Sequence, residues 1–246
     1  MYGELPRGRG LAANITGLYT VFMTRGIFIV GNESALSRAV EAETVKRVER
    51  FAAALIPNRL TGASSAQKPS AADKARLPLD WNPSSPISAR TLALAAENRL
   101  DKIDEAILIC SPPSVRRSAS DLPLADVEIL INDHIKGWFF LIKELASVFS
   151  GRRRGTLSLV YSDVGIGGGK EEDTDLLGPS ALASFRALTR SLLAAAHNEP
   201  YITMGFSSST AGNEETFASF MYKYIDEANK RNNGKLHKYG KFNFFK

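Results

Sequence analysis

Two side chains in this 246-residue sequence could take part in proton transfer or contact a reactive group. Ser162 stands at the end of a predicted strand, and His134 belongs to the residue type that changes charge near neutral pH. A hydrolytic Ser–His pair also needs an oxyanion hole and an acid that orients the histidine, and the sequence indicates neither. A strand-end hydroxyl and a satisfied polar side chain on a helix are the simpler interpretations of these two residues.

A phosphate-binding turn is the second candidate. The segment Gly31-Asn-Glu-Ser-Ala-Leu-Ser37 follows a short apolar run and opens a predicted helix. Backbone N–H groups at such a helix start bind phosphate where glycines allow a close approach. Ala35 and Ser37 stand where glycine would suit best, although Asn32, Ser34 and Ser37 can donate hydrogen bonds. We therefore expect nucleotide binding here in a weakened form.

A glycine-rich segment, Gly165-Ile-Gly-Gly-Gly-Lys170, invites comparison with a Walker A loop. That loop needs Gly-x-x-x-x-Gly-Lys followed by Ser or Thr. Here Val164 replaces the first glycine, Glu171 replaces the hydroxyl residue, and Glu172 and Asp173 would repel phosphate. We expect a mobile lid over a cleft instead, because glycine runs favour flexibility.

The composition excludes several classes of protein. Cys110 is the only cysteine, so no internal disulfide can form, and three scattered histidines predict no metal site. The formal net charge is +5, and its one dense basic run, Arg152–Arg154, predicts a solvated turn rather than a nucleic-acid surface. We expect no membrane span, because no run of about eighteen apolar residues is free of charge, and we expect a cytoplasmic protein.

Strands and helices alternate along the sequence. Short apolar runs predict buried strands at 26–30, 106–110, 156–161 and 201–206. Helical periodicity predicts helices over 35–55, 89–99, 126–149, 179–196 and 214–230. This alternation predicts an α/β fold, a three-layer doubly wound parallel sheet of the Rossmann type. Residues 1–25 are predicted to be an N-terminal extension and residues 26–246 a single domain, with ligands bound at the carboxyl ends of the strands.

In this order the loops resemble those of the short-chain dehydrogenase/reductase family from about Gly26 to the end of the chain. The segment 31–37 matches the family's Gly-x-x-x-Gly-x-Gly turn at Gly31. Asp80, followed by Trp81, matches the strand-end aspartate that meets the adenine. The family's Ser-x-x-Gly matches Ser162-Asp-Val-Gly165. The spacing of these segments carries the resemblance.

The sequence departs from the family at the positions matched to its catalytic motifs. The run Cys110-Ser-Pro-Pro113 replaces the family's Asn-Asn-Ala-Gly, and His134 replaces an asparagine. The Tyr-x-x-x-Lys motif matches Gly178-Pro-Ser-Ala-Leu182, so both catalytic residues are missing. In the family the tyrosine transfers a proton, and the lysine lowers its pKa from about 10.

The resemblance nevertheless implies NAD or NADP as the cofactor and suggests where it would bind. The implied cofactor positions are Gly31, Asn32, Ser34, Ala35, Leu36, Ser37, Asp80, Trp81 and Ser111. Ser162 and His134 are the implied catalytic candidates, and no metal is implied. The two helices expected at 126–149 and 179–196 form dimer bundles in the family, so the resemblance also implies a homo-oligomer, a dimer or tetramer.

Two functions remain open at this point. The first is a pseudoenzyme: a protein with an NAD(P)-binding fold that binds a nucleotide or small ligand, or serves as a partner subunit, without the standard redox chemistry. The alternative is an active NAD(P)-dependent oxidoreductase acting on a carbonyl or alcohol with another proton donor, using His134, Ser162 and Lys170. Because fold does not establish function, the sequence alone does not choose between them.

Overall fold

The computed structural model describes residues 25–48, 50–57, 59–60, 71–115, 117–163 and 175–240. These residues form a seven-stranded sheet in the order β3-β2-β1-β4-β5-β6-β7, with every neighbouring pair parallel. The strands are β1 (Ile27–Asn32), β2 (Phe51–Ile56), β3 (Arg76–Pro78), β4 (Glu105–Cys110), β5 (Thr156–Ser162), β6 (Ile202–Ser208) and β7 (Lys235–Tyr239). The predicted doubly wound parallel sheet is confirmed.

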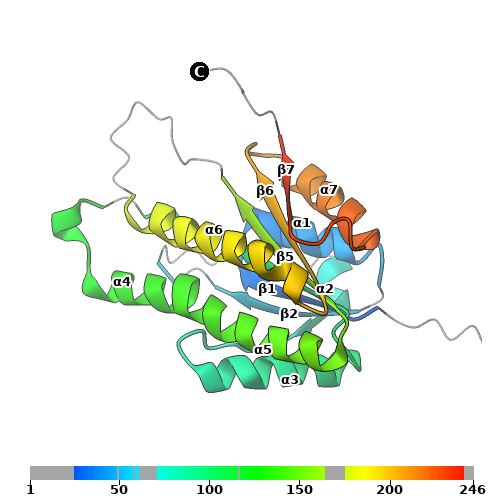
Figure 1. Ribbon diagram of the computed structural model, residues 1–246. Coiled ribbons are helices and arrows are strands. Elements are labelled where there is room, and N and C mark those ends of the chain that lie inside the picture. The colour runs from blue at the N-terminus through cyan, green and yellow to red at the C-terminus, as the bar shows by residue number, and fades with distance from the viewer. Residues whose placement is uncertain are drawn as a thin grey trace, which may run out of the picture.

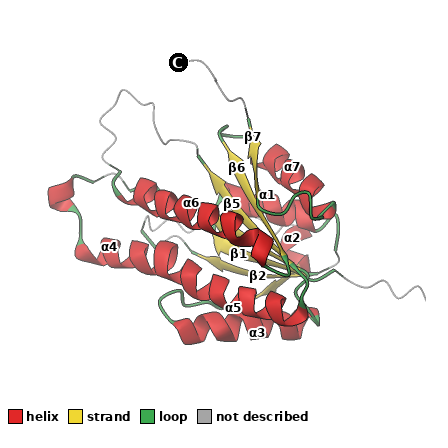
Figure 2. Ribbon diagram, viewed as in Figure 1, coloured by secondary structure: helices red, strands yellow, loops and turns green. Residues whose placement is uncertain are grey.

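Helices cover both faces of this sheet (Figures 1 and 2). One face carries α1 (Ala35–Thr44), α2 (Ala71–Ala75) and α7 (Glu214–Asp226). The other carries α3 (Pro86–Leu100), α5 (Gly137–Arg152) and α6 (Leu177–Ala195). The helix α4 (Leu124–Ile131) leads into α5 through a π-helical turn, η2 (Asn132–Lys136), and packs with α6. Single 3-10 turns, η1 (Ala119–Asp121) and η3 (Ala196–Asn198), complete the described elements.

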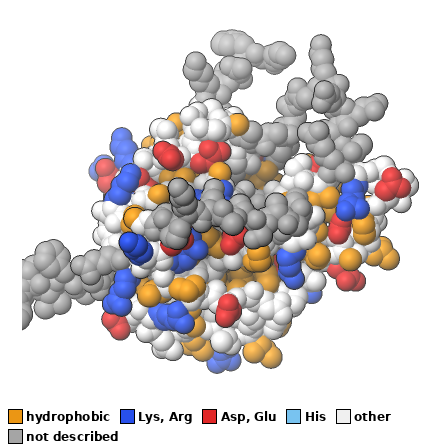
Figure 3. All heavy atoms as spheres, turned by 180° about the vertical axis from the view of Figure 1, so that it is seen from behind, with side chains coloured by type: hydrophobic (Ala, Val, Ile, Leu, Met, Phe, Trp, Pro, Cys, Tyr) orange, Lys and Arg blue, Asp and Glu red, His pale blue; other side chains and the backbone are white. Residues whose placement is uncertain are grey.

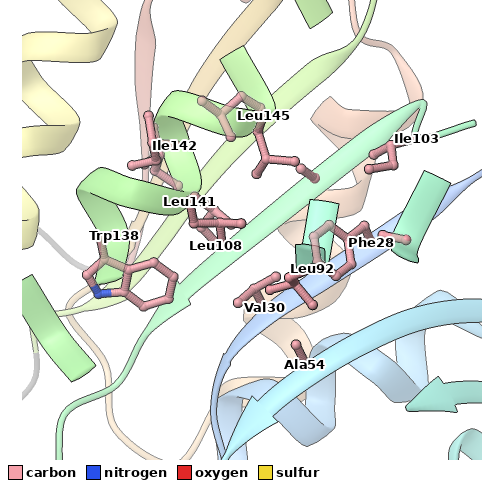
Figure 4. Packing of buried hydrophobic residues seen from close by; sticks show 14 of the residues in the cluster. Phe28, Val30, Ala54, Leu92, Ile103, Leu108, Trp138, Leu141, Ile142 and Leu145 are labelled. Atoms are coloured by element: carbon pink, nitrogen blue, oxygen red, sulfur yellow. The ribbon is translucent and has the colours of Figure 1, made fainter. Parts of the chain in front are cut away.

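The two cores follow from strands that are buried on both sides. Successive side chains of β1 alternate between the faces, so Phe28 and Val30 join one core and Ile27 and Ile29 the other. Figure 4 shows the first core, where strand residues meet Leu92 of α3 and a row of α5 side chains. A fully apolar strand is the pattern expected of a parallel sheet covered by helices on both faces.

The predicted helix over 35–55 is wrong in its second half. Helix α1 ends at Thr44, and the apolar run Phe51–Ile56 forms β2, which pairs with β1. Apolar residues continue the helical stripe into this run, but a run in which five of six residues are buried suits a strand between two layers. Smaller differences concern boundaries: α3 begins at Pro86 rather than at residue 89, and α7 ends at Asp226 rather than at residue 230.

Some predictions lie outside the described residues. These are the N-terminal extension, apart from Arg25, and the glycine-rich segment at 165–170. Within the described part of the chain, no helix is long and apolar enough to cross a membrane. Figure 3 shows basic and acidic side chains interspersed on the face seen from behind.

An ion-pair network lies at the amino end of β4. The guanidinium group of Arg25 pairs with Glu105, the first residue of β4, and with Asp226 at the end of α7. Glu105 is buried, and its burial raises its pKa to about 7 against the opposing charge of Arg25. Because the folded protein holds this proton more tightly than the unfolded chain does, protonated Glu105 favours folding.

We therefore expect Glu105→Gln to remove part of the pH dependence of stability. The contribution of Glu105 is complete below its ordinary pKa of 4.5 and is lost as the pH rises through about 7. At 1.36 kcal/mol per pKa unit this amounts to about 3 kcal/mol. Between pH 4 and pH 8 the free energy of unfolding of the variant should therefore fall by about 3 kcal/mol less than that of the wild type. Urea denaturation at the two pH values measures it.

Glu43 provides the control for this experiment. Burial of Glu43 is outweighed by hydrogen bonds from Lys46 and Arg47, which lower its pKa. Glu43→Gln should therefore change the pH dependence in the opposite sense. If the free energy of unfolding changes equally with pH in the wild type and the Glu105→Gln variant, the raised pKa assigned to Glu105 is contradicted.

Candidate functional site

The strand order reverses between β1 and β4, and the carboxyl ends of these two strands are where ligands bind in doubly wound sheets. A narrow pocket lies there with a cavity volume of about 10 Å³, room for about one water molecule. Its lining residues are Asn32, Glu33, Pro57, Arg59, Leu60, Ser111, Pro113, Ile129, Asp133 and His134. The structure thus brings together Asn32, Ser111 and His134 of the predicted site.

Gly31 has a packing role in this arrangement. It lies inside β1, opposite Ile109 of β4. A Cβ atom at position 31 would lie 2.7 Å from the Ile109 carbonyl oxygen, which is closer than real Cβ contacts. Contact between the two backbones therefore requires glycine here, whatever binds beyond the strand end.

The hydroxyl groups at the start of α1 bond to each other's backbone. The Ser37 N–H donates to Ser34 Oγ at 3.1 Å, and the Ser34 N–H donates to Ser37 Oγ at 2.9 Å. This reciprocal capping box satisfies donors that would otherwise face a ligand. Ser37 and Leu36 are buried, and Ala35 is exposed. In this arrangement the hydroxyl groups of Ser34 and Ser37 cap the helix.

An ion pair that the sequence analysis missed crosses the pocket. Arg59 Nε donates to Asp133 Oδ2 at 3.1 Å, and its Nη2 donates to Asp133 Oδ1. Arg59 follows β2 and Asp133 lies in η2, so the pair joins the two sides of the strand reversal. The apolar run 51–56 is the signal that could have found it, because a strand there places Arg59 at the carboxyl edge of the sheet.

His134 does not match the expected proton donor. It is buried in η2, and burial lowers its pKa to about 4, with the charge of Arg59 lowering it further and Asp133 opposing. The imidazole is therefore neutral at pH 7, whereas an unperturbed histidine changes its charge near neutral pH. Its Nδ1 atom and Asn32 Oδ1 are both buried without a hydrogen-bond partner among the described residues.

Trp81 is half-buried and packs against the core that carries α3, α5 and α6. Its ring centroid lies 5.6 Å from that of Trp138 in α5, while the neighbouring Asp80 is exposed. A Cβ atom at Gly137 would lie 2.6 Å from Pro83 Cβ and 3.1 Å from the Trp81 ring. Glycine at this position therefore allows the start of α5 to approach the segment after β3.

Ser162 lies elsewhere along the same edge. It ends β5, opposite Ser208 of β6, and does not line the pocket around His134. The next residue, Asp163, lies 3.5 Å from Arg186 Nε of α6. Burial raises the pKa of Asp163, and the charge of Arg186 opposes this shift. The described surroundings of Ser162 thus include a carboxylate and a guanidinium group.

Helix α6 has neither of the residues needed for the family's proton transfer. Its sequence, LGPSALASFRALTRSLLAA, contains no tyrosine and no lysine. At Gly178 a Cβ atom would lie 2.8 Å from Asp175 Oδ2 and 3.0 Å from the Pro113 carbonyl oxygen. Leu182 is buried in the core beside Phe185. The positions matched to tyrosine and lysine therefore have packing roles.

Tyr161 is another hydroxyl-bearing side chain of β5. The hydroxyl of Tyr161 bonds to Ser207, and burial raises the pKa of this tyrosine. Within the described ranges no three His, Cys, Asp or Glu side chains are grouped so that they could hold a metal ion.

Comparison with solved structures shows which fold this is. A short-chain type dehydrogenase/reductase from Mycobacterium marinum superposes with a TM-score of 0.69 at 14% identity, covering 87% of this chain and 93% of that one. The NADH-dependent reductase A1-R′, complexed with NAD, gives 0.66 at 12% identity, with 87% and 94% covered. ElxO with NADP bound gives 0.66 at 12% identity, with 87% and 96% covered.

The chain therefore has the short-chain dehydrogenase/reductase fold, and the resemblance stated from the sequence is confirmed at the level of fold. A scan of the sequence against protein-family models finds no match, and neither does a search of the curated proteins.

The close approach at Gly137 leads to a test of the packing beside the site. Gly137→Ala should destabilise the protein by about 1–3 kcal/mol, because the added methyl group has no room against Pro83 and Trp81. Gly151→Ala in the same helix meets nothing within 4 Å and should stabilise by up to about 1 kcal/mol. Urea denaturation measures both changes, and equal effects would contradict the proposed crowding at Gly137.

Proposed function

We propose that this chain is a pseudoenzyme with the short-chain dehydrogenase/reductase fold, which binds a nucleotide or small ligand without hydride transfer by the family's serine-tyrosine-lysine route. The observation that carries the proposal is α6, which has no tyrosine or lysine and leaves no room for a side chain at Gly178. Ser162 alone cannot transfer the proton, because an alkyl hydroxyl is far too weak an acid. The composition, with its single cysteine, suits a cytoplasmic protein.

NAD or NADP is the ligand that the fold suggests, because the similar reductase A1-R′ and ElxO structures hold NAD and NADP. The pocket at the strand reversal, as its described residues lie, is too small for a dinucleotide to enter. The pocket at the strand reversal has room for about one water molecule, and the Arg59–Asp133 ion pair crosses it. The capping box also occupies hydrogen-bond donors at the start of α1.

The active oxidoreductase with another proton donor is supported less well. A neutral His134 with a pKa of about 4 has no imidazolium proton to give at pH 7. The phenol of Tyr161 is hydrogen-bonded to Ser207 and has a raised pKa, so it too is a poor donor near neutrality.

Self-association is the second part of the proposal. The surface of α4, η2 and α5 exposes large apolar side chains, including Leu124, Ile131 and Phe139. Exposed apolar residues that cluster on one face are typical of protein interfaces. We propose that the helices around 126–149 and 179–196 form a contact between two copies of the chain.

Binding and turnover test the first part. Purified protein should show no oxidation of NADH or NADPH above background with a broad panel of carbonyl compounds, and the His134→Ala variant should likewise show no turnover. Thermal melting with NAD(H) and NADP(H) measures binding separately, because a ligand that binds only the folded state raises Tm with occupancy. Turnover that disappears in Ser162→Ala would overturn the pseudoenzyme assignment.

Sedimentation velocity tests the second part. Phe139 is 52% exposed on α5, and Phe139→Lys should shift a dimer towards the monomer by placing a charge in the contact. Leu94→Lys on α3, where the native side chain is 50% exposed, is the matched control and should leave the association unchanged. A wild-type protein that stays monomeric at high concentration would contradict the proposed contact.

A further inference from the structure

The segment Arg59–Leu60, called the strap below, lies across the strand reversal and contacts the far side at two points. Arg59 pairs with Asp133 through two hydrogen bonds, as described above. Leu60 packs against a small apolar cluster, separate from both main cores, built by Val115, Leu130, Leu177 and Ala181. Because the sheet order is β2-β1-β4, a strap that starts beyond β2 and contacts η2 passes over the end of β1.

The two partners of the ion pair differ strongly in exposure. The Asp133 side chain is 3% exposed, whereas that of Arg59 is 48% exposed. A buried carboxylate depends on its charged partner, because without it the charge is left desolvated and uncompensated. The half-exposed guanidinium group can exchange its partner for water at much lower cost. Asp133 therefore holds the strap in place, and Arg59 is the half of the pair that can leave.

Unsatisfied polar atoms lie in the same pocket. Asn32 Oδ1 and His134 Nδ1 are buried, with their residues 4% and 3% exposed, and neither has a hydrogen-bond partner among the described residues. Both residues line the pocket together with Arg59 and Asp133. Buried polar groups are rarely left unpaired in folded proteins, so these atoms mark a place where a further hydrogen-bonding group fits.

We propose that the Arg59–Asp133 ion pair is a latch, which keeps the strap over the crevice until a ligand replaces both halves of the pair. This inference rests on the proposed function, because it assigns how the ligand site of that function opens. A ligand that opens the latch must offer hydrogen-bond donors to Asp133 and an anion to Arg59. A phosphorylated molecule with free hydroxyl groups meets both demands, and Asn32 and His134 are placed to bond to it.

Asp133→Asn is the variant that tests the latch. It keeps the shape of the side chain and removes the charge, and it leaves only a half-exposed arginine without its partner. Amide hydrogen exchange of the peptide containing residues 59 and 60 should become at least about tenfold faster, since charge-assisted bonds are roughly twice as strong as neutral ones. Arg59→Lys keeps the charge, loses the two-donor geometry, and should give an intermediate rate.

Glu41→Gln is the matched control. Glu41 is a buried carboxylate paired with the part-exposed Arg76, but it lies on α1 on the other face of the sheet. This variant should leave exchange at residues 59 and 60 unchanged. If Asp133→Asn also leaves that exchange unchanged, the strap is not held by the ion pair and the latch is overturned.

Ligand binding is measured separately, with NADH and NADPH as the probes, by thermal melting and calorimetry. Tighter or faster binding by Asp133→Asn than by the wild type supports both the latch and the proposed function. Faster exchange with no nucleotide binding in either protein supports the latch and contradicts nucleotide binding at this site. Equal affinity and equal association rate in the two proteins overturn the latch even where both bind.

Discussion

The parallel contact between β1 and β4 decides where the other parts of this protein lie. The two backbones meet at Gly31 and Ile109 with no space for a Cβ atom between them. From this contact the chain winds outward in both directions, to β3 on one side and to β7 on the other. Each half adds helices to both faces, which leaves the strands buried on both sides and gathers the loops at the carboxyl ends.

Polar groups at these carboxyl ends are mainly engaged with one another. Ser34 and Ser37 cap a helix, Arg59 pairs with Asp133, and Asp163 lies beside Arg186. A group whose hydrogen bonds are already made within the chain gains little from a ligand unless the ligand replaces them with bonds of equal strength. The edge at which doubly wound sheets bind ligands thus carries, among the described residues, polar side chains that bond mainly within the chain.

The elements that the sequence predicts well are those with one dominant signal. The runs at 26–30 and 106–110 are short, apolar and β-branched, and each is a central strand of the sheet. Alternation with helices then suffices for the topology, because parallel crossovers have one hand.

The errors come from signals that depend on the tertiary environment. The run 51–56 is alanine-rich, which suits a helix as an isolated peptide, and only its place between two helical layers makes it a strand. Because of that error Arg59 was not predicted as a site residue. It lies at the carboxyl edge of the sheet only if a strand, and not a helix, precedes it. His134 is buried in the π-helical turn η2, which contacts α6, and hydrophobic periodicity does not report such packing.

The aromatic packing beside Gly137 has a spectroscopic consequence. Trp81 and Trp138 are the only tryptophans of the chain, and their rings are 5.6 Å apart at a tilt of 54°. Indole emission and the near-ultraviolet dichroism of tryptophan therefore arise from a single locus, on the sheet face that carries α3, α5 and α6. Such signals follow the integrity of that layer directly, whereas the layer of α1 and α7 on the opposite face is silent in them and needs a probe of its own.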